Sequence, residues 1–269
     1  MAARGDLAAF LARHRRVFAL TGAGVSTASG IPDYRDEQGA WKRRPPVMIQ
    51  ALRSDPAIYR RYWARAYAGW PRFSTVAPGA AHRAFARWES RGTLAHLVTQ
   101  NVDGLHQQAG SRAVIDLHGR LDEVVCLGCR RRGTRADTQE RLAALNPGWT
   151  AAFATAPDGD ADIDDAASAA FEPPFCDTCG GLLKPDVVFF GENVPVDRYE
   201  CARDALASAD ALLVAGSSLM VYSGYRFARQ AREAGLPIAI VNRGHTRADD
   251  LATLKVEGDV GTLLTEALA

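Results

Sequence analysis

A glycine-rich segment lies where a nucleotide could bind. The segment TGAGVSTASG, residues 21–30, directly follows a short apolar run. Glycines at such a point let backbone N–H groups approach a pyrophosphate, and a following helix N-terminus favours its negative charge. The usual dinucleotide fingerprint is incomplete, because Gly22 and Gly24 match it but Thr27 stands where its third glycine belongs. Taken alone, this loop is weak evidence against a plain turn.

Three polar segments lie beyond predicted strands and favour a ligand-binding site there. GIPDYR, residues 30–35, follows the glycine loop, TQNVDGLH spans residues 99–106, and DLHG spans residues 116–119. A lone histidine is usually structural. His118, however, comes at a strand end that faces the same crevice as two polar segments. Because the unperturbed pKa of histidine lies near working pH, His118 is a candidate general base.

Four of the five cysteines form two C-x-x-C pairs, Cys126 with Cys129 and Cys176 with Cys179. This spacing is typical of a tetrahedral zinc site. With four sulfur ligands there is no open position for water, so the spacing predicts one structural zinc ion. Disulfides are disfavoured in a reducing compartment, and a redox pair would need only one C-x-x-C. The fifth, Cys201, is expected in the core on an amphipathic helix.

The elements that position these residues alternate along the chain. Apolar runs predict strands at 17–21, 94–99, 113–117, 211–215 and 237–241. Asp197 is expected to cap a helix with apolar positions at 202, 205, 206 and 209, and 220–234 and 261–268 also read as helices. This alternation predicts an α/β fold with a Rossmann-like, doubly wound parallel sheet. In such sheets, ligands bind beyond the carboxyl ends of the strands.

Two segments interrupt the alternation and predict a smaller domain. Residues 36–78 are expected to form a helical insertion, and 123–185 a zinc-ribbon insertion with an acidic stretch at 158–170. The dinucleotide-binding domain then comprises residues 1–35, 79–122 and 186–269.

Composition excludes several classes of protein. The net charge of +1 gives no electrostatic reason to expect nucleic acid, and no apolar run is long enough to span a membrane. The N-terminus lacks the apolar stretch of a secretory signal, and the first strand leaves no room for a removable presequence. We therefore expect a cytoplasmic protein, acting as a monomer, with no nucleic-acid or membrane partner.

In chain order, the sequence resembles the sirtuin family in GAGVSTASGIPDYR, TQNVDGLH, DLHG, the paired C-x-x-C, KPDVVFFGENVP, GSSLMVYSGYRF and IVNRG. The resemblance covers nearly the whole chain and is greatest to the class II branch. Within that branch it points to the mitochondrial lipoamidase and ADP-ribosyltransferase types and their bacterial relatives. It implies an NAD-dependent protein lysine deacylase that transfers the acyl group to ADP-ribose and releases nicotinamide.

The resemblance also implies residue roles. His118 would act on the ribose hydroxyls, and Asn101, with Gln100 and Asp103, would hold the nicotinamide ribose and carboxamide. Tyr34 would be the aromatic residue beside nicotinamide, where many relatives have Phe. The remaining NAD contacts implied are Gly22, Ala23, Gly24, Ser26, Thr27, Ile31, Pro32, Asp33, Arg35, Val102, Gly216, Ser217, Ser218, Asn242, Arg243, Gly244 and Val260.

Chemistry agrees with these roles. The acyl-lysine amide oxygen is a poor nucleophile, so it must be held near the ribose carbon. After nicotinamide leaves, a base must deprotonate a ribose hydroxyl, a step that general-base catalysis accelerates about a hundred- to ten-thousand-fold.

The resemblance places the acylated lysine of a protein or peptide between two segments, with the substrate backbone added as a strand. One segment, read as extended, holds Val188, Phe189, Phe190, Gly191 and Glu192, and the other holds Met220, Val221 and Tyr222. Ser223 replaces a proline that many relatives have. Tyr62 and Arg65 lie three apart on one helix face and match a Tyr-x-x-Arg that binds acidic acyl groups in some sirtuins. They favour longer or acidic acyl groups over acetyl, although a solvated helix face would give the same pattern.

Three other functions compete with the deacylase interpretation. An NAD-dependent dehydrogenase would need a regular glycine fingerprint and an acidic ribose ligand, and both are missing. A non-catalytic zinc-ribbon module that recruits nucleic acid or protein would need a basic face, which Arg130, Arg131, Arg132 and Arg135 offer only locally. A protein mono-ADP-ribosyltransferase using the same NAD site remains open, because its early chemistry is shared.

Overall fold

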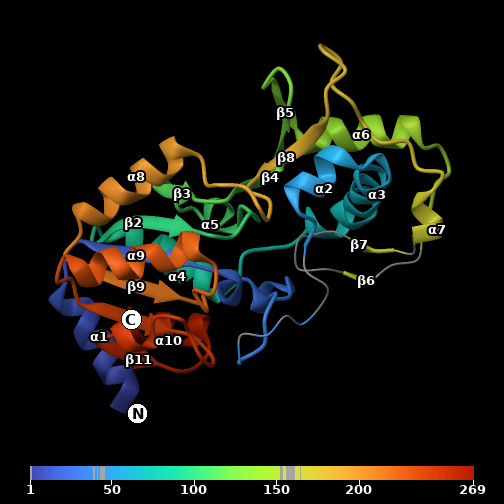
Figure 1. Ribbon diagram of the computed structural model, residues 1–269. Coiled ribbons are helices and arrows are strands. Elements are labelled where there is room, and N and C mark those ends of the chain that lie inside the picture. The colour runs from blue at the N-terminus through green and yellow to red at the C-terminus, as the bar shows by residue number, and fades with distance from the viewer. Residues whose placement is uncertain are drawn as a thin grey trace. The chain divides into compact units, whose positions relative to one another are not determined.

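The computed structural model describes residues 2–38, 40, 42, 46–151, 154–155, 161–163 and 165–269. Its contacts divide the chain into two compact units (Figure 1). Unit 1 comprises residues 1–43, 77–118 and 194–269, and unit 2 comprises 44–76 and 119–193. The domain boundaries expected from the sequence stay a prediction. Of the acidic stretch at 158–170, residues 158–160 and 164 lie outside the described residues.

Unit 1 is built on a six-stranded sheet with the order β11-β10-β9-β1-β2-β3. All neighbouring strands are parallel. The strands are β1 (Val17–Thr21), β2 (Leu94–Thr99), β3 (Val114–Asp116), β9 (Ala211–Ala215), β10 (Ile238–Val241) and β11 (Leu254–Val256). The chain leaves β1 toward β2 and β3, then returns to the other side of β1 with β9. This reversal is the switch point of a Rossmann-like sheet, so the predicted fold class is confirmed.

Helices cover both faces of this sheet (Figure 1). One face packs against α1 (Ala2–Arg13), α4 (Ala80–Ser90) and α10 (Val260–Ala267) through an apolar cluster that includes Leu7, Phe85 and Leu264. The other packs against α8 (Val196–Ala207) and α9 (Tyr222–Glu233) through a cluster that includes Phe18 and Phe227. The sheet is buried on both sides, as its continuous apolar strands require. Short elements complete the unit: α5 (Leu105–Gln108) and the 3-10 turns η1 (Ala23–Val25), η2 (Thr27–Ser29) and η3 (Asp249–Leu251).

Unit 2 combines a three-stranded antiparallel sheet, order β5-β4-β8, with helices. Its strands are β4 (Gly119–Cys126), β5 (Arg132–Thr134) and β8 (Leu183–Val187), with a small β6 (Ala154–Thr155) and β7 (Ala161–Asp162) pair. Its helices are α2 (Ile49–Ser54), α3 (Pro56–Phe73), α6 (Arg135–Leu145) and α7 (Asp165–Ser168). Asp55 caps α3 by accepting from the backbone N–H of Ala57 at 2.8 Å, and Pro56 follows at the first helical position.

Several local expectations were wrong. Cys201 lies on α8 as expected, but it is exposed rather than in the core. Asp197 lies inside the first turn of α8, and Pro195 takes the cap position without a side-chain bond. Arg135 cannot contribute to a basic face, because it is 2% exposed and stacks on the rings of Trp63 and Trp70.

The segment after β8 is also less regular than expected. The strand ends at Val187, and beyond it only Phe190 pairs, in an isolated bridge with Met48. The first glycine loop continues into 3-10 turns rather than an α-helix, so no α-helix N-terminus follows it directly. Among the described helices, none has the length and apolar character that crossing a membrane demands.

Candidate functional site

The ends of β1 and β9 meet at the point where the strand order reverses. There the backbone N–H of Gly24 donates to the carbonyl of Gly216 at 2.8 Å, and that of Gly22 donates to Ala215 at 3.2 Å. A Cβ atom on Gly24 would lie 2.8 Å from the Cα of Gly216. Only glycine fits this approach, so the two loops form a backbone cradle at the ligand-binding end of the sheet.

A cavity of about 320 Å³ opens beside this cradle. It is lined by Gly24, Thr27, Pro32, Asp33, Asp36, Glu37, Lys42, Gly216, Asn242, Arg243, Gly258, Asp259 and Val260. Eight of these residues are among the predicted NAD contacts, and five are not: Asp36, Glu37, Lys42, Gly258 and Asp259. Sequence patterns do not point to four of these five residues. The exception is Asp259, whose position before a helix with Thr262 three residues later is a capping pattern.

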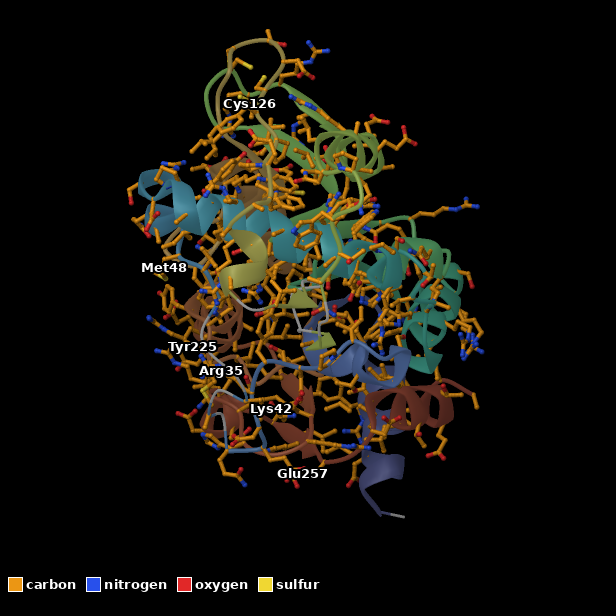
Figure 2. All side chains as sticks on the ribbon, turned by 90° about the vertical axis from the view of Figure 1, so that its right-hand side faces the viewer. Arg35, Lys42, Met48, Cys126, Tyr225 and Glu257 are labelled. Atoms are coloured by element: carbon orange, nitrogen blue, oxygen red, sulfur yellow. The ribbon has the colours of Figure 1, made fainter. Side chains whose placement is uncertain are left out.

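Two cationic side chains line the cavity, each beside a carboxylate. Lys42 Nζ lies 2.5 Å from Asp33 Oδ1, and an Arg243 nitrogen lies 3.7 Å from Asp259 Oδ2. A hydrogen bond from the backbone N–H of Thr262 lowers the pKa of Asp259, because it stabilises the carboxylate. Lys42 is labelled in Figure 2, and both cationic residues belong to unit 1.

The loop that carries Asp33 and Lys42 is held by its own hydrogen bonds. Lys42 N–H donates to the carbonyl of Tyr34 at 3.0 Å, and Asp36 accepts from the N–H of Ala40 at 2.8 Å. The carbonyl of Glu37 accepts from His245 N–H at 2.9 Å. A Cβ on Gly244 would lie 2.4 Å from that carbonyl, so Gly244 allows the loop to dock.

Beneath the cavity, Asn101 and Asp103 join one polar network. Asn101 Nδ2 donates to the Gly22 carbonyl at 3.1 Å and to Ser26 Oγ at 3.0 Å. Ser26 Oγ donates to Asp103 Oδ2 at 2.7 Å. His82 Nε2 lies 3.3 Å from Ser26 Oγ, while its Nδ1 accepts from Gly79 N–H, so Nε2 carries the proton and donates. His82 joins this network although no sequence motif pointed to it.

His118 lies just beyond β3 with both ring nitrogens occupied. Nδ1 is 2.9 Å from the carbonyl of Gln100, and Nε2 is 2.8 Å from Ser223 Oγ. A carbonyl can only accept, so the proton sits on Nδ1 and Nε2 holds the lone pair. Burial lowers the pKa of His118 to about 4, so the ring is neutral at physiological pH. Its Nε2 can therefore act as a base.

Gln100 is itself fixed by the glycine cradle. Its Nε2 donates to Ser217 Oγ at 2.8 Å and to the Thr21 carbonyl at 3.2 Å. The other predicted NAD contacts of this unit lie in the same loops: Ala23 on η1, Ile31, Tyr34 and Arg35 in the loop after η2, Val102 after β2, and Ser218 after Gly216. Arg35 is labelled in Figure 2.

In unit 2, the predicted substrate segment is anchored by a buried ion pair. Lys184 is 5% exposed and donates to Glu192 Oε2 at 3.0 Å, and the same oxygen accepts from Phe189 N–H at 2.9 Å. A Cβ on Gly191 would lie 2.5 Å from Gln50 Oε1, and Gln50 donates to the Gly191 carbonyl at 3.2 Å. Lys184 and Gln50 are further positioning residues that the sequence did not reveal.

The predicted acyl-pocket pair lies on α3. Tyr62 is buried, and its ring centroid lies 5.3 Å from that of Phe189, so these two predicted substrate contacts meet. Arg65 is half-buried on the same helix. The remaining predicted substrate contacts belong to unit 1, where Val221 and Tyr222 are exposed and Met220 is half-buried.

The four predicted zinc ligands gather in unit 2, near the label for Cys126 in Figure 2. Their sulfur atoms lie within 4.8 Å of one another. The Sγ atoms of Cys126 and Cys179 are 3.5 Å apart, and those of Cys129 and Cys176 are 3.6 Å apart. Zn–S bonds of about 2.3 Å in a tetrahedron put sulfurs about 3.8 Å apart, so the set fits zinc. Backbone N–H groups, first that of Thr178, lower the pKa of Cys176 to about 6 and favour the thiolate.

Comparisons with known proteins agree on one family. The model of the Sir2 family matches residues 22–223. An "NAD-dependent protein deacetylase" of Xanthomonas axonopodis is 61% identical over 92% of this chain and 85% of its own length. The human "NAD-dependent protein lipoamidase sirtuin-4, mitochondrial" is 50% identical over 96% of this chain and 84% of its own.

The solved structures that match this chain include Sir2 proteins. One described as "Sir2-p53 peptide-NAD+" superimposes with a TM-score of 0.77 at 34% identity, covering 98% of this chain and 95% of its own. A second, described as "Structure of Sir2Tm bound to a propionylated peptide", has a TM-score of 0.76 at 31% identity, covering 98% and 96%.

Proposed function

Because the chain belongs to the Sir2 family and is an NAD-dependent protein deacylase, we propose that His118 is its general base and that the β1–β9 cradle holds NAD. The observation that carries this proposal is the tautomer of His118. The Gln100 carbonyl holds the proton on Nδ1, so Nε2 is available to take a proton from a ribose hydroxyl. The expected class of enzyme and its NAD dependence are confirmed; the individual residue roles are proposals.

The residues of the cavity suit a dinucleotide. Gly24 and Gly216 bring backbone groups close to the ligand, while Lys42 and Arg243 offer positive charge for its diphosphate. Asn242 and Val260 line the cavity wall proposed for the adenosine. When bound, NAD supplies an electrophilic ribose carbon and a neutral leaving group, nicotinamide.

The polar network orients the reacting end. Asn101 and Asp103 share Ser26, so neither side chain can turn without breaking a partly buried hydrogen bond. Such fixed polar groups can hold the ribose and carboxamide in near-attack geometry at little entropic cost. The acyl oxygen bonds to the ribose carbon as nicotinamide leaves. His118 then takes the proton of a ribose hydroxyl, whose oxygen attacks the acyl carbon, and a water molecule completes the release of lysine. The products are free lysine, nicotinamide and O-acyl-ADP-ribose.

We also propose an acyl group larger than acetyl. Tyr62 packs against Phe189, and Arg65 follows one turn later on α3, so this face of unit 2 offers an apolar wall and a cation. A half-buried guanidinium favours an anionic or polar acyl end. The lipoamidase name of the human relative supports a long chain, and the deacetylase names support acetyl.

The test is mass spectrometry of NAD reactions with peptides carrying acetyl-, propionyl-, succinyl-, glutaryl-, lipoyl- or long-chain acyl-lysine. We expect O-acyl-ADP-ribose from at least one longer acyl group at a higher rate than from acetyl. His118→Ala should lower that product at least about a hundredfold. His14→Ala, at the end of α1 and outside the cavity, is the matched control and should leave the rate unchanged.

Three outcomes would contradict parts of the proposal. A His118→Ala variant that makes the product at the wild-type rate would remove the base role. ADP-ribose attached to protein, without O-acyl-ADP-ribose, would favour the mono-ADP-ribosyltransferase alternative. A succinyl or glutaryl preference that survives Arg65→Met would remove the role of that arginine in acyl selection.

A further inference from the structure

The first turn of α9 contacts the proposed base directly. Ser223 Oγ lies 2.8 Å from His118 Nε2, the nitrogen that must take the ribose proton. Ser223 is the second residue of α9, which begins at Tyr222. The contact joins two segments of unit 1 more than a hundred residues apart, since the residue separation is 105.

The approach of α9 to His118 is built into the fold. A Cβ on Gly224 would lie 2.3 Å from Gln100 Oε1, so a glycine is required for the helix to come this close. Gln100 is fixed by Ser217 and Thr21, and its carbonyl holds His118 Nδ1. Gln100 therefore contacts both His118 and Gly224, the residue next to Ser223.

The backbone of Ser223 is held as well. Arg226 Nε donates to the Ser223 carbonyl at 3.2 Å, and its guanidinium lies 3.9 Å from the ring centroid of Tyr199 on α8. Tyr225, the next residue but one after Ser223, is labelled in Figure 2. Its ring has the guanidinium of Arg247 4.3 Å from the centroid. These contacts hold the backbone of the first turn of α9, from which the Ser223 side chain projects.

We propose that Ser223 is a positioning residue for His118: its hydroxyl orients Nε2 and then accepts a hydrogen bond from the imidazolium. This proposal rests on the proposed role of His118 as base. In the neutral ring, Ser223 O–H donates to the Nε2 lone pair. When the ribose hydroxyl arrives, the Ser223 hydroxyl rotates so that its O–H leaves the Nε2 lone pair. The ribose O–H bond then breaks, its proton passes to Nε2, and its electron pair forms the bond to the acyl carbon. The new Nε2–H can donate to the Ser223 Oγ.

The charges around His118 destabilise its imidazolium, so a hydrogen-bond acceptor at Nε2 matters more. Arg226 on α9 and Arg198 on α8 both disfavour the imidazolium, and burial disfavours it further. The partners that favour it are the Gln100 carbonyl at Nδ1 and Ser223 Oγ at Nε2. Hydrogen bonds to charged groups contribute about twice as much as neutral ones, so losing Ser223 should slow proton transfer about tenfold.

Two readouts separate this role from a structural one. Nicotinamide cleavage precedes the proton transfer, so exchange of labelled nicotinamide into NAD does not need His118 as a base. Formation of O-acyl-ADP-ribose does need it. The ratio of product formation to exchange therefore reports the base step alone, in one sample of the full-length protein with NAD and an acyl-lysine peptide.

We expect Ser223→Ala to lower this ratio about tenfold while exchange stays near the wild-type rate. Ser223→Pro should also lower the ratio about tenfold, because it removes the hydroxyl and proline is tolerated in the first helical turn. Agreement between the two variants would show that the effect is not a folding artefact of one of them. Ser223→Thr keeps the hydroxyl and should restore the ratio. The control is Ser90→Ala at the exposed end of α4, where the hydroxyl donates to the Arg87 carbonyl.

A Ser223→Ala ratio equal to the wild type would overturn the proposal. A faster product rate would also overturn it, since the hydroxyl would then be competing with the ribose for Nε2. An equal fall in exchange and product would assign Ser223 a merely structural role. His118→Ala tests the underlying function separately: if it loses the product but keeps exchange, the base role stands whatever Ser223 does.

Discussion

At the scale of single residues, two buried histidines below the cavity stand in contrasting surroundings. His82 has partners at both ring nitrogens, Gly79 N–H and Ser26 Oγ. His106 has Thr21 Oγ1 at 3.0 Å from Nε2, but its Nδ1 has no hydrogen-bond partner among the described residues. A second proton on His106 would therefore be buried without an acceptor, and burial lowers its pKa to about 3.

This gives a prediction for stability against pH. The unfolded state binds a proton at His106 near pH 6.5, whereas the folded state binds it only near pH 3, so stability falls as pH drops below about 6.5. Between pH 7 and pH 5 the loss from this residue should be about 2 kcal/mol. Urea unfolding of the wild type and His106→Gln at both pH values measures it. The glutamine variant should show a smaller fall; parallel pH dependences would refute the assignment.

At the scale of elements, the contact between the β1 and β9 loops depends on backbone conformation as well as space. Gly216 has a φ of +62°, and a Cβ there would lie 2.6 Å from the backbone nitrogen of Val25. Gly92, in the turn before β2, has a φ of +78° but has nothing within 4 Å of its would-be Cβ. Comparing the two glycines therefore separates the effect of backbone strain from the effect of steric crowding.

We expect Gly92→Ala to cost about 1 kcal/mol of unfolding free energy, because only the left-handed conformation is strained. Gly216→Ala should cost more, since the strand ends must also move apart, and it should weaken NAD binding at least about tenfold. Denaturant unfolding and calorimetric titration with NAD measure the two effects. Unimpaired NAD binding by Gly216→Ala would show that the cradle does not carry the ligand.

The sequence predicted the buried strands well and the residues between them poorly. Runs such as 211–215 are apolar throughout because both sheet faces are covered, and the structure keeps those bounds. The strand β11 was missed, because Leu254–Val256 is only three residues long and has Lys255 at its centre. Lys42 and His82 could not be foreseen, because their place depends on tertiary contacts rather than local pattern. The resemblance to the family's motifs predicted residue roles that composition and spacing could not.

At the scale of the whole molecule, the two units differ in what stabilises them. Unit 1 has apolar clusters on both faces of its sheet. Among its described residues, unit 2 has one apolar cluster, built around Trp63, Tyr59 and Phe171. The cysteine cluster joins its segments 126–129 and 176–179. A small unit whose chain segments are joined by four thiolates should depend on the metal for its fold.

Replacing one ligand tests that dependence. Cys176→Ser should lower bound zinc from one equivalent per chain to nearly none and reduce the free energy of unfolding by several kcal/mol, since structural zinc sites bind with roughly 10 kcal/mol or more. Cys201→Ser, on the exposed face of α8, is the matched control and should keep its zinc. Metal analysis and thermal unfolding give the readouts. Full zinc content in Cys176→Ser would exclude this residue as a ligand.

The central position of β1 also sets an order of events during synthesis. Val17 pairs with Leu94 on one side and with Ala211 on the other, so the first strand made is flanked by one that emerges far later. All residues of unit 2, 44–76 and 119–193, leave the ribosome before β9 does. At about 5–20 residues per second, β1 waits on the order of ten seconds or more for its second neighbour. The nucleotide cradle can therefore be assembled only after all of unit 2 has been made and has had time to fold.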